Sequence, residues 1–261
     1  MTVPAAYVDL AGRLAEASGS ITRHYFRSLP EVGEKSDTTP VTVADWEAEV
    51  AMRKMILANY PEHGIVGEEG GAVRENAEFV WVLDPIDGTK NYASGSYQFG
   101  TLVSLLQDSN YVLGIIDQPI LRERWLGVRG QPTTFNGKPI KSRKCDSLKN
   151  AWMYSTTPAM FKFEKLKLFE GLADQVQHSL FGTDCIGYGL LASGYIDIVC
   201  EAQMNLWDYA AHVPIVEGAG GVISDWGGNP LTLKSGGTVL ASGDKRVHDA
   251  ALKALAGSTF G

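Results

Sequence analysis

The chain has 261 residues, of which 44% are hydrophobic and 20% charged, and this usage excludes disordered, collagen-like and coiled-coil proteins. The net charge of −7 argues against a nucleic-acid-binding surface of the usual basic kind. The three cysteines stand at irregular spacing without a CxxC pair, which favours a reducing compartment over a disulfide framework. No apolar run approaches the roughly 18 residues of a membrane span. We therefore expect a soluble, cytoplasmic protein without nucleic-acid or membrane partners.

The first half of the chain predicts two helices followed by strands. Apolar residues at helical spacing predict one helix around residues 8–17 and a second around 48–56, which starts at Thr42 with Asp45 as its capping-box partner. Strands are predicted at 79–86, 99–107, 111–118 and 123–129. The second and third of these flank a short polar turn, which is typical of an antiparallel hairpin.

The second half alternates strands and helices. Strands are predicted at 151–156, 195–202, 220–226 and 238–242, and helices at 160–176, at 187–194, from near Trp207 and from Asp244. Elements of both kinds in both halves predict an α/β fold of layered sheets and helices. The polar stretch at 131–147 marks a loose boundary, so we expect an N-terminal half (1–140) and a C-terminal half (141–261) within one compact unit.

The densest group of polar residues is WVLDPIDGTKNY, at 81–92. Asp84 and Asp87 end the predicted strand, and Pro85 between them stiffens the turn. The Gly-Thr pair that follows is typical of a helix start, where free N–H groups favour an anion such as phosphate. Two carboxylates would repel that phosphate unless a hard divalent cation lay between them. Oxygen-only ligands indicate Mg²⁺.

Two other interpretations start from the same residues of this segment. An ordinary surface turn uses the same residue types, so the tetrapeptide alone does not decide. The haloacid-dehalogenase pattern needs a nucleophilic aspartate where this chain has Pro85, which excludes it. Two further acids favour the metal site, since Glu68 follows an apolar stretch at another strand end and Asp208 opens an apolar helix. Asp208 has a plainer role as charge at a helix start, and Asp45 as a cap.

Together these segments resemble the inositol monophosphatase-like family of metal-dependent phosphatases. The similarity covers nearly the whole chain, and the matching motifs stand in family order at 37–49, 67–71, 81–92 and 207–221. The resemblance implies a layered αβαβα fold, a homodimer and two or three Mg²⁺ ions per subunit. It also implies hydrolysis of a phosphate monoester by direct attack of a metal-activated water, without a covalent nucleophile.

The resemblance assigns a role to each acidic residue. The implied metal ligands, most of them in the N-terminal half, are Glu68, Asp84, the Ile86 carbonyl, Asp87 and Asp208. Glu68 would contact a third ion through water, which makes it catalytic as well. Thr89 paired with Asp45 would orient and help deprotonate the attacking water, and the N–H groups of Gly88 and Thr89 would hold the phosphate.

Two more acids point to the substrate. Asp184 stands where inositol monophosphatases are expected to have a small apolar residue, and Glu201 matches the position that contacts the alcohol in family members. Two carboxylates suit the amine and imidazole of histidinol, through charge-assisted hydrogen bonds. This region, with 99–107 and 113–127, is similar to the histidinol-phosphate phosphatase branch. That similarity implies hydrolysis of L-histidinol phosphate, a step of histidine biosynthesis.

Alternative functions stay open at the sequence level. Residues 203–208, QMNLWD, are nearer to the inositol-type Trp-Asp than to the histidinol branch, so an inositol monophosphatase is the first alternative. A nucleotide phosphatase would need an insertion for which 261 residues leave little room. A non-catalytic accessory factor of the transcription machinery is the alternative of another class, and the net charge of −7 gives it little support.

Overall fold

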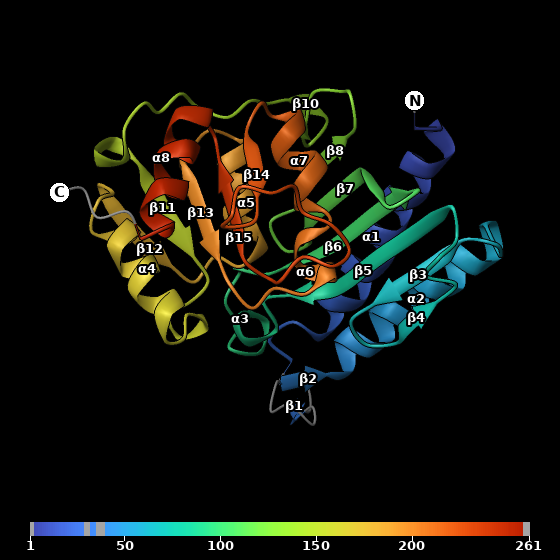
Figure 1. The fold of residues 1–261 in the computed structure, drawn as a ribbon. Helices are drawn as coiled ribbons and strands as arrows, with labels where there is room; N and C mark the ends of the chain where they lie inside the picture. Colours follow the sequence, from blue (N-terminus) through green and yellow to red (C-terminus); the bar gives the residue numbers. More distant parts are fainter. Residues whose placement is uncertain (1–2, 29–31, 35–39, 258–261) are drawn as a thin grey trace.

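Two main sheets layered with helices make up the computed structural model, which describes residues 3–28, 32–34 and 40–257 (Figure 1). The α-helices of this described part are α1 (Ala5–Tyr25), α2 (Val43–Asn59), α3 (Thr89–Ala93), α4 (Glu164–Ala173), α5 (Cys185–Ala192), α6 (Leu206–Tyr209), α7 (His212–Gly218) and α8 (Lys245–Leu255). Two short 3-10 helices are η1 (Leu148–Asn150) and η2 (Pro158–Met160). None of the helices among the described residues is long and apolar enough to cross a membrane.

The larger sheet has eight strands in the order β10-β9-β8-β7-β6-β5-β3-β4. In chain order they are β3 (Gly64–Gly67), β4 (Gly71–Val73), β5 (Phe79–Asp87), β6 (Gly100–Gln107), β7 (Asn110–Gln118), β8 (Glu123–Val128), β9 (Thr134–Phe135) and β10 (Lys138–Pro139). Neighbouring strands are antiparallel, except that β3 runs parallel to β5. The predicted hairpin is β6–β7, with positive φ at both turn residues, Asp108 and Ser109.

The smaller sheet has five strands in the order β12-β11-β13-β15-β14. They are β11 (Trp152–Ser155), β12 (His178–Phe181), β13 (Ile198–Glu201), β14 (Val222–Ser224) and β15 (Val239–Ser242). Strand β11 is parallel to both of its neighbours, and the other pairs are antiparallel. A separate two-stranded hairpin, β1 (Val32–Glu34) with β2 (Pro40–Thr42), precedes α2.

Alternation of side chains along each strand sets the layers. On β5, Trp81 and Leu83 pack with apolar residues of α1 and α2, whereas Val80 and Val82 pack with those of α5 and α7. The smaller sheet covers the other side of α5 and α7, and its far face packs on α4 and α8. The order of layers is therefore α1/α2, large sheet, α5/α7, small sheet and α4/α8, which confirms the predicted αβαβα fold.

The expected division at residue 140 falls between the two sheets. Helices α5 and α7 pack against both sheets, and the organisation into two halves of one compact unit stays a prediction. The single helix expected from near Trp207 is two short helices, α6 and α7. Residues 37–39 of the first family motif lie outside the described residues, and α2 begins directly after Thr42, while the capping-box contact with Asp45 stays a prediction.

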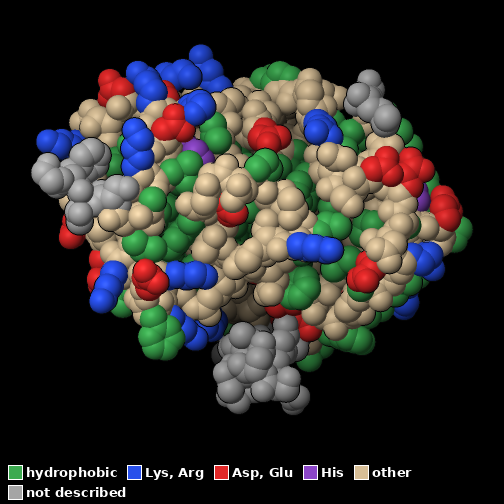
Figure 2. All heavy atoms as spheres, viewed as in Figure 1, with side chains coloured by type: hydrophobic (Ala, Val, Ile, Leu, Met, Phe, Trp, Pro, Cys, Tyr) green, Lys and Arg blue, Asp and Glu red, His purple; other side chains and the backbone are tan. Residues whose placement is uncertain are grey.

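Charges are mixed over the surface. Figure 2 shows acidic and basic side chains interspersed over one face of the molecule. The net charge of −7 therefore forms no large acidic patch on this face. Several of the acids that the sequence singled out are instead almost fully buried, namely Asp45, Asp84 and Glu201.

Asp244 caps α8, the helix that the sequence predicts to start there. Its carboxylate accepts hydrogen bonds from the backbone N of Arg246 at 2.9 Å and of Cys145 at 3.3 Å, and it pairs with the Arg246 guanidinium. We expect Asp244→Ala to lower the free energy of unfolding at pH 7 by about 1–2 kcal/mol, measured by urea denaturation.

This loss should depend on pH. The Arg246 hydrogen bond, first among the causes, holds the pKa of Asp244 below its ordinary value. A group with a depressed folded pKa stabilises the protein above its unfolded pKa of about 3.9 and loses that effect as the pH falls. The difference between variant and parent should therefore shrink below about pH 4. Asp249→Ala, on the exposed face of α8, is the control, and an equal loss in both variants would contradict the capping role.

Candidate metal centre and adjoining pocket

A β-bulge brings Asp84 and Asp87 to the same side of strand β5. Asp84 pairs with Leu102 of β6 and Asp87 with Gly100, so β5 advances by three residues where β6 advances by two. Residues three apart on a regular strand face opposite sides of the sheet, and one extra residue restores the same side. Pro85 lies in the bulge, where its missing N–H is tolerated, and its carbonyl accepts a hydrogen bond from Thr101 Oγ1 at 2.8 Å.

Asp84 is a fully buried carboxylate with an unpaired oxygen. Its Oδ1 accepts a hydrogen bond from the backbone N of Ile86 at 3.0 Å, and its Oδ2 has no hydrogen-bond partner among the described residues. Burial raises the pKa of this carboxyl well above its ordinary value, and four neighbouring carboxylates raise it further, namely Glu68, Asp87, Asp208 and Asp45. Negative charges thus converge on the Asp84 carboxyl, which is buried away from solvent.

Three aspartates meet closely enough to share one ion. Asp84, Asp87 and Asp208 each offer an oxygen, and these oxygens lie within 4.8 Å of one another. Helix starts orient two of the three carboxylates: Cys185 N, at the start of α5, donates to Asp87 Oδ2 at 2.6 Å, and Asn205 N, at the start of α6, donates to Asp208 Oδ2 at 2.7 Å. Oxygen-only donors around an uncompensated buried charge fit a hard divalent cation.

The start of α3 adjoins this cluster. Gly88 has a φ of 87°, and a Cβ on it would lie 2.8 Å from the Gln98 carbonyl oxygen, so only glycine fits here. Thr89 Oγ1 donates to the Ile86 carbonyl at 3.0 Å, the carbonyl that the sequence predicts as a metal ligand. The expected pairing of Thr89 with Asp45 stays a prediction, although Asp45 is buried on α2 and its charge acts on Asp84.

A cavity of about 150 Å³ opens beside the cluster and contains the two acids expected to bind substrate. Asp87 and Asp208 line it together with Asp184 and Glu201. Glu201 ends β13 and is 1% exposed. Its Oε1 accepts hydrogen bonds from Thr156 N at 2.9 Å and Thr156 Oγ1 at 3.1 Å, whereas Oε2 has no partner among the described residues. Burial raises the pKa of Glu201 well above its ordinary value.

Asp184 is held in the same cavity by a neighbouring helix. It precedes α5 with a φ of 42°, an unusual value for a residue other than glycine. Asn91 of α3 donates to Asp184 Oδ2 at 2.5 Å and to the Gly182 carbonyl at 3.1 Å. Burial raises the pKa of Asp184 to about 6, against the opposing effects of Asn91, Lys90 and Thr156. The Asn91 hydrogen bond thus favours the ionised form of this carboxyl against the effect of burial.

The structure adds residues that sequence reasoning missed. Asn91 donates a hydrogen bond to Asp184, and Thr156 donates to Glu201, so each orients one of the two acids expected to bind substrate. Asn91 lies within the 81–92 motif and could have been singled out there, whereas Thr156 carries no sequence signal. His212, on the cavity wall, stacks on Tyr188 with ring centroids 3.8 Å apart, and burial lowers its pKa to about 3, so it is neutral at pH 7.

Comparison with known proteins shows the family of the chain. The inositol monophosphatase family matches residues 6–259 of the chain. The chain belongs to this family. Its members are phosphatases that hydrolyse phosphate monoesters and depend on metal ions, and the convergent acids agree with that dependence.

Individual members of the inositol monophosphatase family show how similar the chain is. An inositol monophosphatase from Zymomonas mobilis, whose structure is solved, has 43% sequence identity to this chain. The two structures superpose with a TM-score of 0.91 over 98% of this chain and 100% of that one. A bifunctional phosphatase, IMPL2, of Arabidopsis thaliana chloroplasts is 43% identical over 95% of this chain and 75% of its own length. A histidinol-phosphatase of Chlorobaculum parvum is 34% identical over 90% of this chain and 92% of its own.

Proposed function

We propose that the chain is a Mg²⁺-dependent phosphomonoesterase that hydrolyses L-histidinol phosphate to L-histidinol and phosphate. The choice of substrate is supported by a second acidic pair, Asp184 and Glu201, in the cavity next to the cluster of aspartates. The buried Glu201 Oε2 lacks a partner among the described residues. Leaving such an oxygen without a partner is costly, and an ammonium or imidazolium group donates to it more strongly than a neutral hydroxyl does.

The metal ligands of this proposal are Glu68, Asp84, the Ile86 carbonyl, Asp87 and Asp208, with two or three Mg²⁺ ions per subunit. When bound, the cations supply positive charge against the phosphoryl group and make water more acidic. The unpaired Asp84 oxygen and the raised pKa of that carboxyl support this assignment, because both indicate a missing positive charge.

The remaining residues would bind and orient the reactants. Thr89 and Asp45 would align the attacking water with the phosphorus atom and take its proton. The N–H groups of Gly88 and Thr89 would hold phosphate oxygens as charge develops on them. Glu201 and Asp184 would receive the cationic groups of the alcohol, which fixes the ester oxygen relative to the water. Asn91 and Thr156 would position those two carboxylates.

A direct comparison of substrates tests the proposal. We expect kcat/KM in saturating Mg²⁺ to be at least about tenfold higher for histidinol phosphate than for inositol 1-phosphate. A tenfold ratio corresponds to about 1.4 kcal/mol, which is close to the contribution of one charge-assisted hydrogen bond. Asp184→Ala should narrow this ratio. A preference for inositol 1-phosphate would favour the second candidate, an inositol monophosphatase, which the name of the Zymomonas mobilis relative supports.

The same assay separates an enzyme from a binding protein. Release of phosphate from either ester in Mg²⁺, abolished by a chelator, supports catalysis, and no release from a panel of phosphate monoesters would favour an accessory factor. The homodimer and the cytoplasmic location stay predictions, and light scattering of the purified chain tests the former.

A further inference from the structure

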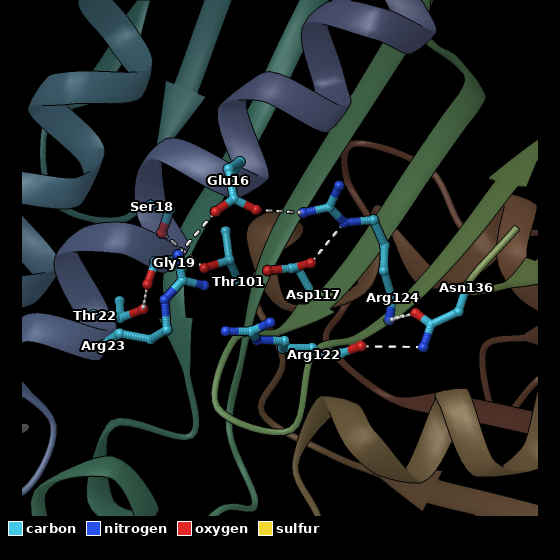
Figure 3. Close-up of polar contacts among 10 residues, drawn as sticks. All are labelled: Glu16, Ser18, Gly19, Thr22, Arg23, Thr101, Asp117, Arg122, Arg124 and Asn136. Atoms are coloured by element: carbon cyan, nitrogen blue, oxygen red, sulfur yellow. Dashed lines mark hydrogen bonds and ion pairs between the residues drawn. The ribbon is translucent and has the colours of Figure 1, made fainter.

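A second, larger cavity lies outside the metal centre, and none of the residues that line it lines the acidic pocket. It measures about 640 Å³, opens to the surface, and is lined by residues of α1, β7, β8 and β9 and of the turns that join β7 to β8 and β9 to β10. Figure 3 shows its charged residues, which come from α1, β7, β8 and the turn before β8 and lie around one space. They are three arginines, Arg23, Arg122 and Arg124, and two acids, Glu16 and Asp117.

Two of the arginines are fixed by the two acids. Arg23 contacts Glu16 at 2.8 Å, and Arg124 contacts Asp117 at 2.6 Å and Glu16 at 3.6 Å. Asp117 is nearly buried at the floor of the cavity. These contacts hold the Arg23 and Arg124 guanidinium groups at the wall, where each retains further N–H donors.

The third arginine has no acid of its own. The Arg122 guanidinium makes no ion pair or hydrogen bond with any residue that the structure describes. Its backbone is nevertheless fixed, because Asn136 Nδ2 donates to the Arg122 carbonyl at 3.0 Å and Asn136 Oδ1 accepts from Arg124 N at 2.9 Å. Figure 3 shows the Arg122 side chain extending from this turn toward the side of the cavity that Arg23 lines.

The balance of charge favours an anion. Three guanidinium groups against two carboxylates leave one positive charge in the cavity, although the chain as a whole carries −7. Guanidinium groups bind carboxylate and phosphate oxygens in pairs. The volume is typical of a site for a small molecule and exceeds what a lone phosphate ion fills.

We propose that this cavity binds a small anionic metabolite through a carboxylate or phosphate group, with Arg122 and Arg23 as the receptors of that group. Thr134 and Asn136 on the same wall supply polar contacts for the rest of the molecule. The site is separate from the metal centre, so it does not depend on the proposed substrate.

Two non-hydrolysable probes test this site on the full chain in Mg²⁺, and the quantity measured is the binding that the arginine variants lose, because methylphosphonate also fits the metal centre of the proposed function. Succinate carries only carboxylates, and methylphosphonate carries only a phosphate-like group, so the two titrations distinguish the sources of the anion. We expect saturable binding of at least one probe by calorimetry. Arg122→Gln should weaken it about tenfold or more and Arg23→Gln should also weaken it, as expected for loss of a charge-assisted hydrogen bond. Arg122→Lys should restore part of the affinity.

The matched control is Arg13→Gln, which removes an exposed α1 arginine paired with Asp9 and should leave binding unchanged. Phosphatase activity without probe should be the same in all four variants, since none touches the metal centre. No saturable binding of either probe, or equal binding by the parent and Arg122→Gln, would overturn the proposal. Neither result bears on the substrate of the metal centre, because binding is measured without turnover.

Discussion

Asp87→Asn should lower kcat by at least about 10³-fold, which corresponds to about 4 kcal/mol of lost transition-state stabilisation. The amide keeps the oxygen that accepts from Cys185 N, so the fold should persist, while the charge that faces Asp84 and Asp208 is lost. Phosphate release with saturating Mg²⁺ measures the effect. Asp174→Asn, at an exposed position after α4, is the matched control and should keep the parent rate.

Stability gives a second measurement that does not need turnover. The parent should gain stability with Mg²⁺ according to its occupancy, about 2.7 kcal/mol at a hundred times the dissociation constant. Asp87→Asn should lose most of that gain. It should also be more stable than the parent when no cation is present, because one of several mutually repelling charges is gone. A near-normal rate together with a normal Mg²⁺-induced shift would remove Asp87 from the metal site.

Glu201→Gln should reduce kcat/KM for histidinol phosphate by about 10- to 100-fold. It should change kcat/KM for the phosphate monoester of an uncharged alcohol by less than about threefold. The substitution preserves shape and the acceptor that Thr156 uses, so only the charge beside the cavity changes. The discrimination between the two substrates is the quantity measured. Asp184→Asn should act in the same direction.

Two controls keep this prediction specific. Mg²⁺ titration of each variant separates a loss of cation affinity from a loss of substrate recognition, because the charge of Asp184 acts on Asp87. Glu164→Gln, on the first turn of α4, should change neither substrate. Equal losses on both esters in Glu201→Gln would mean that Glu201 does not recognise a cation.

The fold was predictable to the extent that its elements are long and periodic. Helices α1 and α2 and strands β5 to β8 follow the apolar patterns on which the predictions rested. Strands β4, β9, β10 and β12 were missed because they have only two to four residues and lie at or near sheet edges, where too few side chains are buried to leave a pattern. The single helix predicted from near Trp207 is interrupted after Tyr209, which local spacing did not indicate.

Only part of the candidate site can be predicted from the sequence. Its acids stand out because Asp84 and Asp87 follow a buried strand and belong to recurring motifs. The bulge that turns both toward one side cannot be predicted from spacing alone, since it depends on pairing with β6. The same limit applies to Thr156, whose importance arises only because β11 lies beside β13 in the small sheet.

The three aspartates that could share an ion come from segments that are far apart along the chain. Asp84 and Asp87 belong to the large sheet, whereas Asp208 lies on α6, which connects strands β13 and β14 of the small sheet through α7. An ion held by all three would act as a crosslink between distant segments of the chain, with the entropic benefit that closing a long loop brings. Loading the centre would thus make the molecule unfold more cooperatively, so that cation supply sets its resistance to heat and proteases as well as its turnover.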